Sequence, residues 1–313
     1  MVREEVKIGV IGATGLIGSA LIGHLESRSL GALRVFLRSS SQSISATGPA
    51  VEECRGELSS LDDCERFVDG LSVIYYLAHR NTPVVSDIDL PNDFLLNSVP
   101  LLNVIQSVRR RGSKPHVVYF SSGGAIYGNR ADRTPFVETD PPRPTSSYGI
   151  QKLMAEQYLR LATDQGALTA TVLRIGNAYG GLLASERLQG LIGVAVNNTL
   201  QGQPVRVFGN VANIRDYIHL DDICRIAERV IQPVEPFSVF NVGSQKGYSV
   251  DDVLDLIERH GGRPVHRQIV TDPALGAWMP SWCVLDVDRA KSVLSWTPQI
   301  GLSDGIARMF QSV

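Results

Sequence analysis

Short apolar runs alternate along the first half of the chain with segments whose apolar residues recur at helical spacing. Continuous apolar runs are typical of strands that are buried on both faces of a parallel sheet. Such runs occupy Val6–Ile11, Leu33–Leu37, Val73–Leu77, Val117–Phe120 and Thr169–Ile175. Helices are predicted between them at Leu16–Leu25, Leu61–Val68, Phe94–Val108 and Ser146–Asp164. The alternation predicts an α/β fold built on a doubly wound parallel sheet.

Two further features concern chain organisation. Pro100 lies inside the predicted helix Phe94–Val108 and is expected to bend or break it. Beyond residue 175 the pattern becomes irregular, with loops rich in Gly and Asn at 176–181 and 209–213. We therefore expect one domain over residues 1–175 and a smaller C-terminal lobe, mainly for substrate binding, over 176–313. Some segments of the second half, such as Ser238–Val242, are expected to return to the first sheet.

Composition narrows the class of protein. The 313 residues are 43% hydrophobic and 20% charged with a net charge of −2, as in ordinary globular enzymes, which gives no sign of nucleic-acid or membrane binding. The N-terminus is acidic, unlike a signal peptide, and no apolar stretch reaches the roughly 20 residues of a membrane span. Four widely spaced cysteines lack the spacing of metal ligands, so no metal site and no disulfide framework is predicted. We expect a cytoplasmic protein.

A glycine-rich segment follows the first predicted strand and opens the first helix. It reads Gly12-Ala-Thr14-Gly15-Leu16-Ile17-Gly18. Glycines at this spacing permit a tight turn and let backbone N–H groups approach a pyrophosphate at the helix N-terminus. Glycines also close ordinary turns, but their position between a strand and a helix favours a dinucleotide site, so the first domain is predicted to bind a dinucleotide.

The end of the second predicted strand bears on which dinucleotide is bound. An acidic residue there binds the ribose 2′-hydroxyl of NAD, whereas a basic residue accommodates the 2′-phosphate of NADP. The chain has Arg38 followed by Ser39 and two further serines, and it has no carboxylate at this point. This pattern slightly favours NADP over NAD. The other interpretation is that Arg38 is a solvated loop charge.

Three side chains form a candidate catalytic group. Tyr148 and Lys152 lie at i and i+4 of a predicted helix and therefore share one face. A phenol needs a nearby ammonium to act as a base near neutral pH, because its reference pKa is about 10. Ser122 ends a strand at the edge where such sheets bind ligands, and it could hold a reacting oxygen by a hydrogen bond. An incidental surface pair is the alternative for Tyr148 and Lys152.

With these motifs on one chain, the sequence resembles the extended short-chain dehydrogenase/reductase family, particularly its nucleotide-sugar epimerases and dehydratases. The resemblance covers nearly the whole chain and implies a Rossmann domain that binds NAD or NADP. Beyond the residues above, it implies cofactor-binding roles for Glu57, Leu58, Leu77, Ala78, His79 and Asn97, as well as for Tyr148 and Lys152 themselves. It also implies substrate-binding roles for Ser122, Gly123, Asn177 and Arg215.

The chain departs from the family pattern at two places. Many members have the catalytic Ser or Thr where this chain has Gly123, so Ser122 is taken as the nearest hydroxyl. The family often clamps the diphosphate with an Arg before the C-terminal segment, but residues 272–282 contain none and Arg267 is out of register. Trp278 and Trp282 in this stretch could pack a lid or stack on a base. Near Arg215, Asp221 is expected to cap a helix and His219 to pack.

The resemblance implies a nucleotide-sugar 4-epimerase, in which Tyr148 removes a hydroxyl proton, a nicotinamide carries the hydride and a 4-ketosugar forms transiently. An NADPH-dependent reductase of nucleotide-4-ketosugars is the first alternative, which Arg38 favours. A non-catalytic NAD(P)-binding protein of the same fold is the second. A 4,6-dehydratase is less favoured, because Gly123 and Gly124 leave no acid and base beside Ser122. The helices Phe94–Val108 and Ser146–Asp164 resemble those that form dimer interfaces in the family, so a homodimer is expected.

Overall fold

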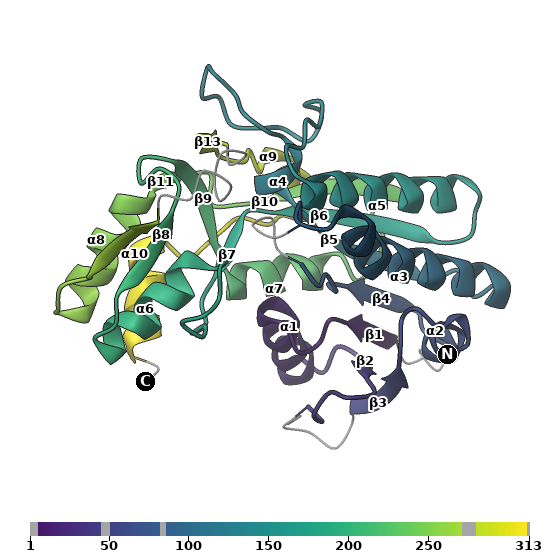
Figure 1. Ribbon diagram of the computed structural model, residues 1–313. Coiled ribbons are helices and arrows are strands. Elements are labelled where there is room, and N and C mark those ends of the chain that lie inside the picture. The colour runs from purple at the N-terminus through teal and green to yellow at the C-terminus, as the bar shows by residue number, and fades with distance from the viewer. Residues whose placement is uncertain (1–5, 45–50, 82–85, 271–279, 312–313) are drawn as a thin grey trace.

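A parallel sheet forms the centre of the molecule. The computed structural model describes residues 6–44, 51–81, 86–270 and 280–311. The sheet contains β1 (Lys7–Ile11), β2 (Ala32–Arg38), β3 (Val51–Gly56), β4 (Val73–Tyr76), β5 (His116–Ser122), β6 (Thr169–Ile175) and β10 (Phe237–Val242). In the described chain these seven strands follow the order β10-β6-β5-β4-β1-β2-β3 (Figure 1). The predicted doubly wound sheet is confirmed, and its order reverses between β1 and β4, where such sheets bind ligands.

Helices cover both faces of this sheet (Figure 1). One face carries α1 (Leu16–Ser27), α7 (Leu220–Arg229) and α9 (Asp288–Leu294), and the other carries α2 (Leu61–Val68), α3 (Leu90–Arg111) and α5 (Ser147–Asp164). Alternate strand residues contribute to the two cores, since Tyr75 packs with the first layer and Tyr76 with the second. This two-sided burial explains why the strands are continuous apolar runs.

Two elements differ from the sequence pattern. The predicted interruption at Pro100 is wrong, because α3 is one helix of 22 residues with Pro100 inside it. Proline removes one backbone hydrogen bond, but Leu101, Val104 and Val108 on the following turns are buried in the core and keep the helix continuous. The strand β3 was not predicted, because it pairs only with β2 at the sheet edge and is therefore largely polar.

The second half of the chain forms a smaller lobe beside the sheet (Figure 1). It has its own apolar core, to which α6 (Leu191–Gln201), α8 (Val250–Gly261) and α10 (Leu302–Gln311) contribute. Its strands are β7 (Asn177–Tyr179), β8 (Val205–Phe208), β9 (Ile214–His219), β11 (Gly247–Ser249), β12 (Arg267–Val270) and β13 (Trp282–Cys283). A short helix, α4 (Gly123–Ile126), follows β5. Among the described residues, no helix is long and apolar enough to cross a membrane.

The start of α7 fixes the C-terminal segment. The expected cap Asp221 is not the cap, because Nδ1 of His219 accepts the backbone N–H of Asp221 at 3.1 Å. Asp222 is fully buried instead, and its carboxylate accepts the N–H groups of Gln299 at 2.9 Å and Ile300 at 3.0 Å. Its carboxylate also accepts a hydrogen bond from Arg225. One carboxylate therefore satisfies two backbone donors of the segment that leads into α10.

We predict that Asp222→Ala lowers the free energy of unfolding by about 3 kcal/mol, because two backbone N–H groups and a guanidinium lose a buried acceptor. Urea denaturation followed by circular dichroism measures this difference. The matched control is Asp221→Ala, since the Asp221 side chain is 61% exposed. Equal losses in the two variants would contradict the anchoring role of Asp222.

Candidate functional site

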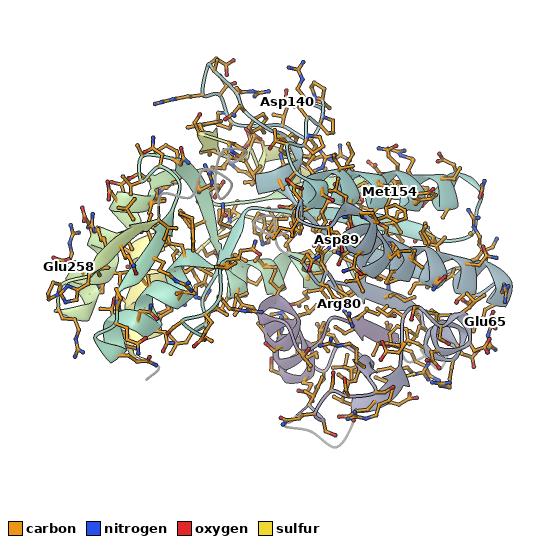
Figure 2. The ribbon with its side chains drawn as sticks, viewed as in Figure 1. Glu65, Arg80, Asp89, Asp140, Met154 and Glu258 are labelled. Atoms are coloured by element: carbon orange, nitrogen blue, oxygen red, sulfur yellow. The ribbon has the colours of Figure 1, made fainter. Side chains whose placement is uncertain are left out.

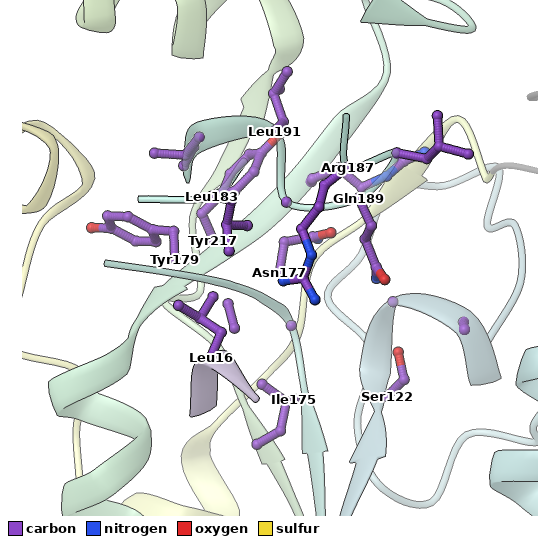
Figure 3. A pocket seen from close by; sticks show the side chains of 18 of the residues that line it. Leu16, Ser122, Ile175, Asn177, Tyr179, Leu183, Arg187, Gln189, Leu191 and Tyr217 are labelled. Carbon is purple, nitrogen blue, oxygen red and sulfur yellow. The ribbon is translucent and has the colours of Figure 1, made fainter. Parts of the chain in front are cut away.

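A cavity of about 510 Å³ lies between the carboxyl edge of the central sheet and the smaller lobe. Its walls come from the β1–α1 turn, the ends of β4, β5 and β6, the start of α5, and the β8 and β9 region. Twelve of the residues selected from the sequence line it: Gly12, Gly15, Leu16, Ile17, Gly18, Leu77, His79, Ser122, Tyr148, Lys152, Asn177 and Arg215. Figure 3 shows Ser122, Asn177 and Tyr217 around this space. The fold thus brings distant sequence motifs to one place.

The glycine segment forms one wall of the cavity. Gly12 has a φ of +93°, and a Cβ there would lie 2.8 Å from the backbone nitrogen of Ala78. A Cβ on Gly18 would lie 2.2 Å from the carbonyl oxygen of Gly12. The absence of side chains lets the turn pack on the end of β4 while the N-terminus of α1 faces the cavity. These residues fit the pyrophosphate of a dinucleotide.

Tyr148, Lys152 and Ser122 converge at the opposite wall. The helix α5 begins after Ser146, whose side chain accepts the N–H of Gly149, and this cap sets the first turn on which Tyr148 lies. Ser122 hydrogen-bonds the Tyr148 phenol. The Lys152 ammonium donates to the carbonyl oxygen of Phe120 at 2.8 Å and lies 5.5 Å from the centre of the Tyr148 ring. The pair is therefore buried and ordered, unlike an incidental surface pair.

Burial changes the acidity of both groups. It raises the pKa of Tyr148 to about 12, although the hydrogen bond from Ser122 acts in the other direction. It lowers the pKa of Lys152 to about 7, and the nearby Glu156 carboxylate offsets part of this effect. Between these values the pair holds one proton, on the phenol oxygen or on the amine nitrogen. Transfer of this proton from the phenol to the amine then gives phenolate and ammonium without uptake or release of a proton.

Residues that the sequence reasoning missed hold this group in place. The Glu156 carboxylate accepts a hydrogen bond from Ser121 at 2.6 Å and pairs with Arg174 at 2.7 Å. Three successive β5 residues, Phe120 to Ser122, therefore contact three successive turns of α5. The spacing of Tyr148, Lys152 and Glu156 at i, i+4 and i+8 was a signal in the sequence for this shared face.

A second missed residue, Asp93 of α3, joins the first turn of α5 to the loop after β4. It is 1% exposed and accepts hydrogen bonds from Asn97 and Ser147, each at 2.9 Å, and from Gln151. Asn97 does not line the cavity, but its side-chain oxygen accepts the N–H of Arg80 at 2.6 Å. Arg80 and Asp89, the N-cap of α3, are both exposed, and both are labelled in Figure 2.

Several other predicted residues lie outside the cavity lining. Thr14, Arg38, Ser39 and Glu57 are exposed, and Leu58 is half-buried with its carbonyl oxygen accepting from Asn103. The backbone of Ala78 packs against Gly12 of the glycine turn. Gly123 is buried, and a Cβ there would lie 2.6 Å from Leu285, so a hydroxyl side chain does not fit without movement. This crowding explains why Ser122, one position earlier, is the hydroxyl beside Tyr148.

The cavity is lined by cations. Arg80, Arg187, Arg206 and Arg215 line it together with Lys152, and the lining among described residues has no Asp or Glu. In Figure 3, Arg187 points from the loop before α6 toward Asn177. Arg187 and Arg206 were not selected from the sequence, because nothing in their local sequence marks them. A cavity of this composition suits an anionic ligand.

Arg267 and Trp282 flank the stretch that lacks a diphosphate-binding arginine, and neither side chain lines the cavity. Arg267 pairs with Asp251 at 2.7 Å and with Asp255, and it does not line the cavity. Trp282 is 8% exposed and packs near Phe136, with ring centres 6.1 Å apart. Trp278 lies outside the described residues. Trp282 therefore packs in a core rather than on a ligand.

Comparisons with known proteins agree with this site. The model of the NAD-dependent epimerase/dehydratase family matches residues 8–243. The chain is 26% identical to a dTDP-4-dehydro-6-deoxyglucose reductase of Escherichia coli, over 98% of each chain. It is 29% identical to a UDP-glucose 4-epimerase of Mycolicibacterium smegmatis, over 96% of each. A crystal structure of a Thermus thermophilus UDP-glucose 4-epimerase in complex with NAD matches with a TM-score of 0.87 and 25% identity, covering 98% of this chain and all of that one.

The family match spans the glycine turn, Ser122, Tyr148, Lys152 and Arg215, which are the residues that meet in the cavity. It covers well over half of the chain and confirms the resemblance drawn from the sequence motifs. The protein therefore belongs to the NAD-dependent epimerase/dehydratase family and is an NAD(P)-dependent enzyme.

Proposed function

We propose that the protein is a nucleotide-sugar 4-epimerase that acts through a transient 4-ketosugar. The observation that carries this proposal is the convergence of Tyr148, Lys152 and Ser122 in a cavity whose other wall is the glycine turn. In this proposal residues 1–175 mainly bind the dinucleotide, and residues 176–313 mainly bind the sugar nucleotide.

The residues proposed to hold NAD or NADP lie along the carboxyl edge of the sheet. Gly12, Gly15 and Gly18 would receive the pyrophosphate at the N-terminus of α1. Lys152 and His79 line the cavity farther along the same edge. When bound, the nicotinamide accepts a hydride from the sugar carbon and returns it, which no side chain of the cavity can do.

The proton transfer is assigned to Tyr148. As the C4–H electron pair leaves the sugar, the C4–O bond becomes a carbonyl and the hydroxyl proton moves to the Tyr148 oxygen. Ser122 holds the sugar oxygen beside the phenol, and the Lys152 ammonium stabilises the phenolate. Return of the hydride to the other face of C4, with return of the proton from Tyr148, gives the 4-epimer without net oxidation.

The substrate is proposed to be a sugar linked to a nucleoside diphosphate. The cavity cations and the lack of carboxylates in its described lining suit the two negative charges of a diphosphate. Of the residues selected for substrate binding, Arg215, Asn177 and Ser122 line the cavity and Gly123 does not, while Arg187 and Arg206 supply further positive charge there. Relatives in both comparisons are named for UDP- and dTDP-sugars.

A ketosugar reductase is the second candidate, and a specific observation favours it. Arg38 is exposed at the end of β2, where a carboxylate would select NAD, and a basic residue suits the 2′-phosphate of NADP. A net reductase commonly consumes NADPH, and one relative across 98% of the chain is named as a reductase. In a reductase, Tyr148 would donate a proton to a 4-ketosugar that binds as the substrate, with Lys152 and Ser122 in the same supporting roles.

We also propose a homodimer built on α3 and α5. These helices pack side by side, and Ser98 of α3 hydrogen-bonds Gln151 of α5. Their outer surfaces carry exposed apolar side chains at Leu90, Phe94, Leu95, Ile150, Tyr158 and Leu161. Apolar surface concentrated on two adjacent helices is typical of a helical dimer interface.

Tyr148→Phe is expected to lower kcat by roughly 10² to 10⁴, because the group that takes the hydroxyl proton is lost. Dinucleotide affinity, measured by calorimetry, is expected to stay within about twofold, since the ring remains. Tyr158→Phe on the same helix is the control, because Tyr158 is 40% exposed and does not line the cavity. Full activity of Tyr148→Phe would refute the proposed chemistry.

Arg38→Ala is expected to weaken NADP⁺ binding by about 10- to 100-fold through loss of charge-assisted hydrogen bonds to the 2′-phosphate. The affinity for NAD⁺, measured on the same variant by calorimetry, serves as the internal control and is expected to be unchanged. If both affinities fall equally, or neither changes, Arg38 does not select the cofactor.

Ile150→Glu is expected to convert the dimer to a monomer, because a charge is placed in an apolar interface; Ile150 is 57% exposed on the isolated chain. Light scattering at micromolar concentration would report the mass. Val293→Glu is the control, since Val293 is 43% exposed on α9, away from α3 and α5. A monomeric unaltered protein would contradict the proposed dimer.

A further inference from the structure

Asp216 lies between two residues of the cavity wall but does not line the cavity itself. Arg215 and Tyr217 line it, and successive side chains of a strand point to opposite faces, so the Asp216 carboxylate points away from the ligand space. The residue is 1% exposed within β9. A carboxylate buried this deeply is unfavourable unless hydrogen-bond donors surround it, so its partners indicate what it does.

Four hydrogen bonds from three residues end on this carboxylate. Oδ1 of Asp216 accepts the backbone N–H of Ser244 at 2.6 Å and the Ser244 hydroxyl at 2.7 Å. Oδ2 accepts the backbone N–H groups of Leu285 at 3.1 Å and Gln245 at 3.3 Å. A Cβ on Gly243 would lie 2.4 Å from Oδ2, so only a glycine lets the chain pass this close. Burial raises the pKa of Asp216 to about 6, and the donors act in the other direction, so the group is ionised at neutral pH.

These hydrogen bonds join the smaller lobe to the central sheet. Ser244 and Gln245 follow β10, an edge strand of that sheet, whereas Asp216 belongs to β9 of the lobe. Leu285 follows β13, which pairs with β9, and its side chain lies against Gly123, the residue after β5. One carboxylate therefore sets the position of β9 relative to the sheet edge that borders the cavity.

Two cavity residues depend on this position of β9. The carbonyl oxygen of Asp216 accepts the side-chain amide N–H of Asn177 at 3.1 Å, and a Cβ on Gly176 would lie 3.0 Å from the same oxygen. The Arg215 guanidinium donates to the carbonyl oxygen of Ile214 at 2.9 Å and has no carboxylate partner among the described residues. The strand itself is thus what orients Arg215, and its charge is left for a ligand.

We propose that Asp216 is a positioning residue for the sugar nucleotide, which fixes β9 to the central sheet so that Arg215 faces the diphosphate and Asn177 faces the cavity. This inference rests on the proposed binding of a nucleotide sugar. Asp216 acts through Arg215 and does not touch the ligand, because its four donors come from the protein and it lies outside the cavity lining. Its loss is therefore expected to weaken substrate binding and to leave proton and hydride transfer intact.

Asp216→Asn tests the proposal, because the amide keeps one acceptor oxygen and replaces the other by a donor that faces backbone N–H groups. The matched control is Asp222→Asn, since Asp222 is also a buried carboxylate that accepts two backbone N–H groups but holds the segment before α10. Both variants are expected to unfold at a lower temperature than the unaltered protein. Only Asp216→Asn should also lose affinity for the substrate.

The probes are UDP, dTDP and GDP, measured by calorimetry, together with the KM for the nucleotide sugar. In Asp216→Asn we expect the diphosphate that the unaltered protein binds best to bind about fivefold more weakly, with a matching rise in KM. The kcat and the dinucleotide affinity should stay within about twofold. Ser244→Ala, which removes one of the four donors, should give a smaller loss in the same direction and decides the test if Asp216→Asn does not fold.

Arg215→Ala separates positioning from a general disturbance of the site. If Asp216 acts through Arg215, Asp216→Asn adds at most about twofold to the loss of diphosphate affinity that Arg215→Ala already causes. A further fivefold loss in the double variant, an equal loss in Asp222→Asn, or unchanged affinity in both Asp216→Asn and Ser244→Ala would each overturn the inference.

Failure of the proposed function has a different signature. The unaltered protein would then bind a nucleoside diphosphate with the expected dependence on Asp216 and Arg215 but would turn over no nucleotide sugar. If the unaltered protein binds none of the three diphosphates, both the proposed function and this inference are wrong.

Discussion

The burial of a phenol beside an ammonium, at the edge of the central sheet, is the constraint on which the site depends. Burial raises the pKa of Tyr148 and lowers the pKa of Lys152, so between the two values the pair holds one proton that can pass between groups about one turn of α5 apart. Burial of Lys152 without support would drive the ammonium to its neutral form, which could not stabilise a phenolate. The Phe120 carbonyl oxygen and the Glu156 carboxylate provide that support.

This arrangement requires further buried polar groups. Glu156 is itself neutralised by Arg174 of β6, and Arg174 also donates to the Tyr127 hydroxyl at 2.8 Å. Asp93 fixes the first turn of α5 from the other side through Ser147 and Gln151. Such networks stabilise a fold only when every member has its partners, because a buried charge left alone is strongly unfavourable. The result is a rigid wall opposite the glycine turn, against which a ligand can be oriented.

The sequence predicts a feature correctly where the residues of one segment alone determine it. Strands buried on both faces are continuous apolar runs, the glycine turn has no room for side chains, and Tyr148 and Lys152 share a helix face at fixed spacing. Other features depend on tertiary contacts. The edge strand β3 carries too many polar residues to be recognised, and α3 continues through Pro100 because its later turns are buried. Asp93, Arg187 and Arg206 acquire their surroundings only when distant segments meet, so no local signal marks them.

The most direct test of the account is to incubate the protein with NAD⁺ or NADP⁺ and a panel of UDP-, dTDP- and GDP-sugars. Chromatography would identify the sugar product while absorbance at the reduced-nicotinamide band is followed in the same sample. The account predicts that one nucleotide sugar is converted to its 4-epimer with no net change in absorbance. Net consumption of NADPH with a 4-ketosugar and no epimer would contradict the epimerase and establish the reductase, and no turnover of any nucleotide sugar would contradict both.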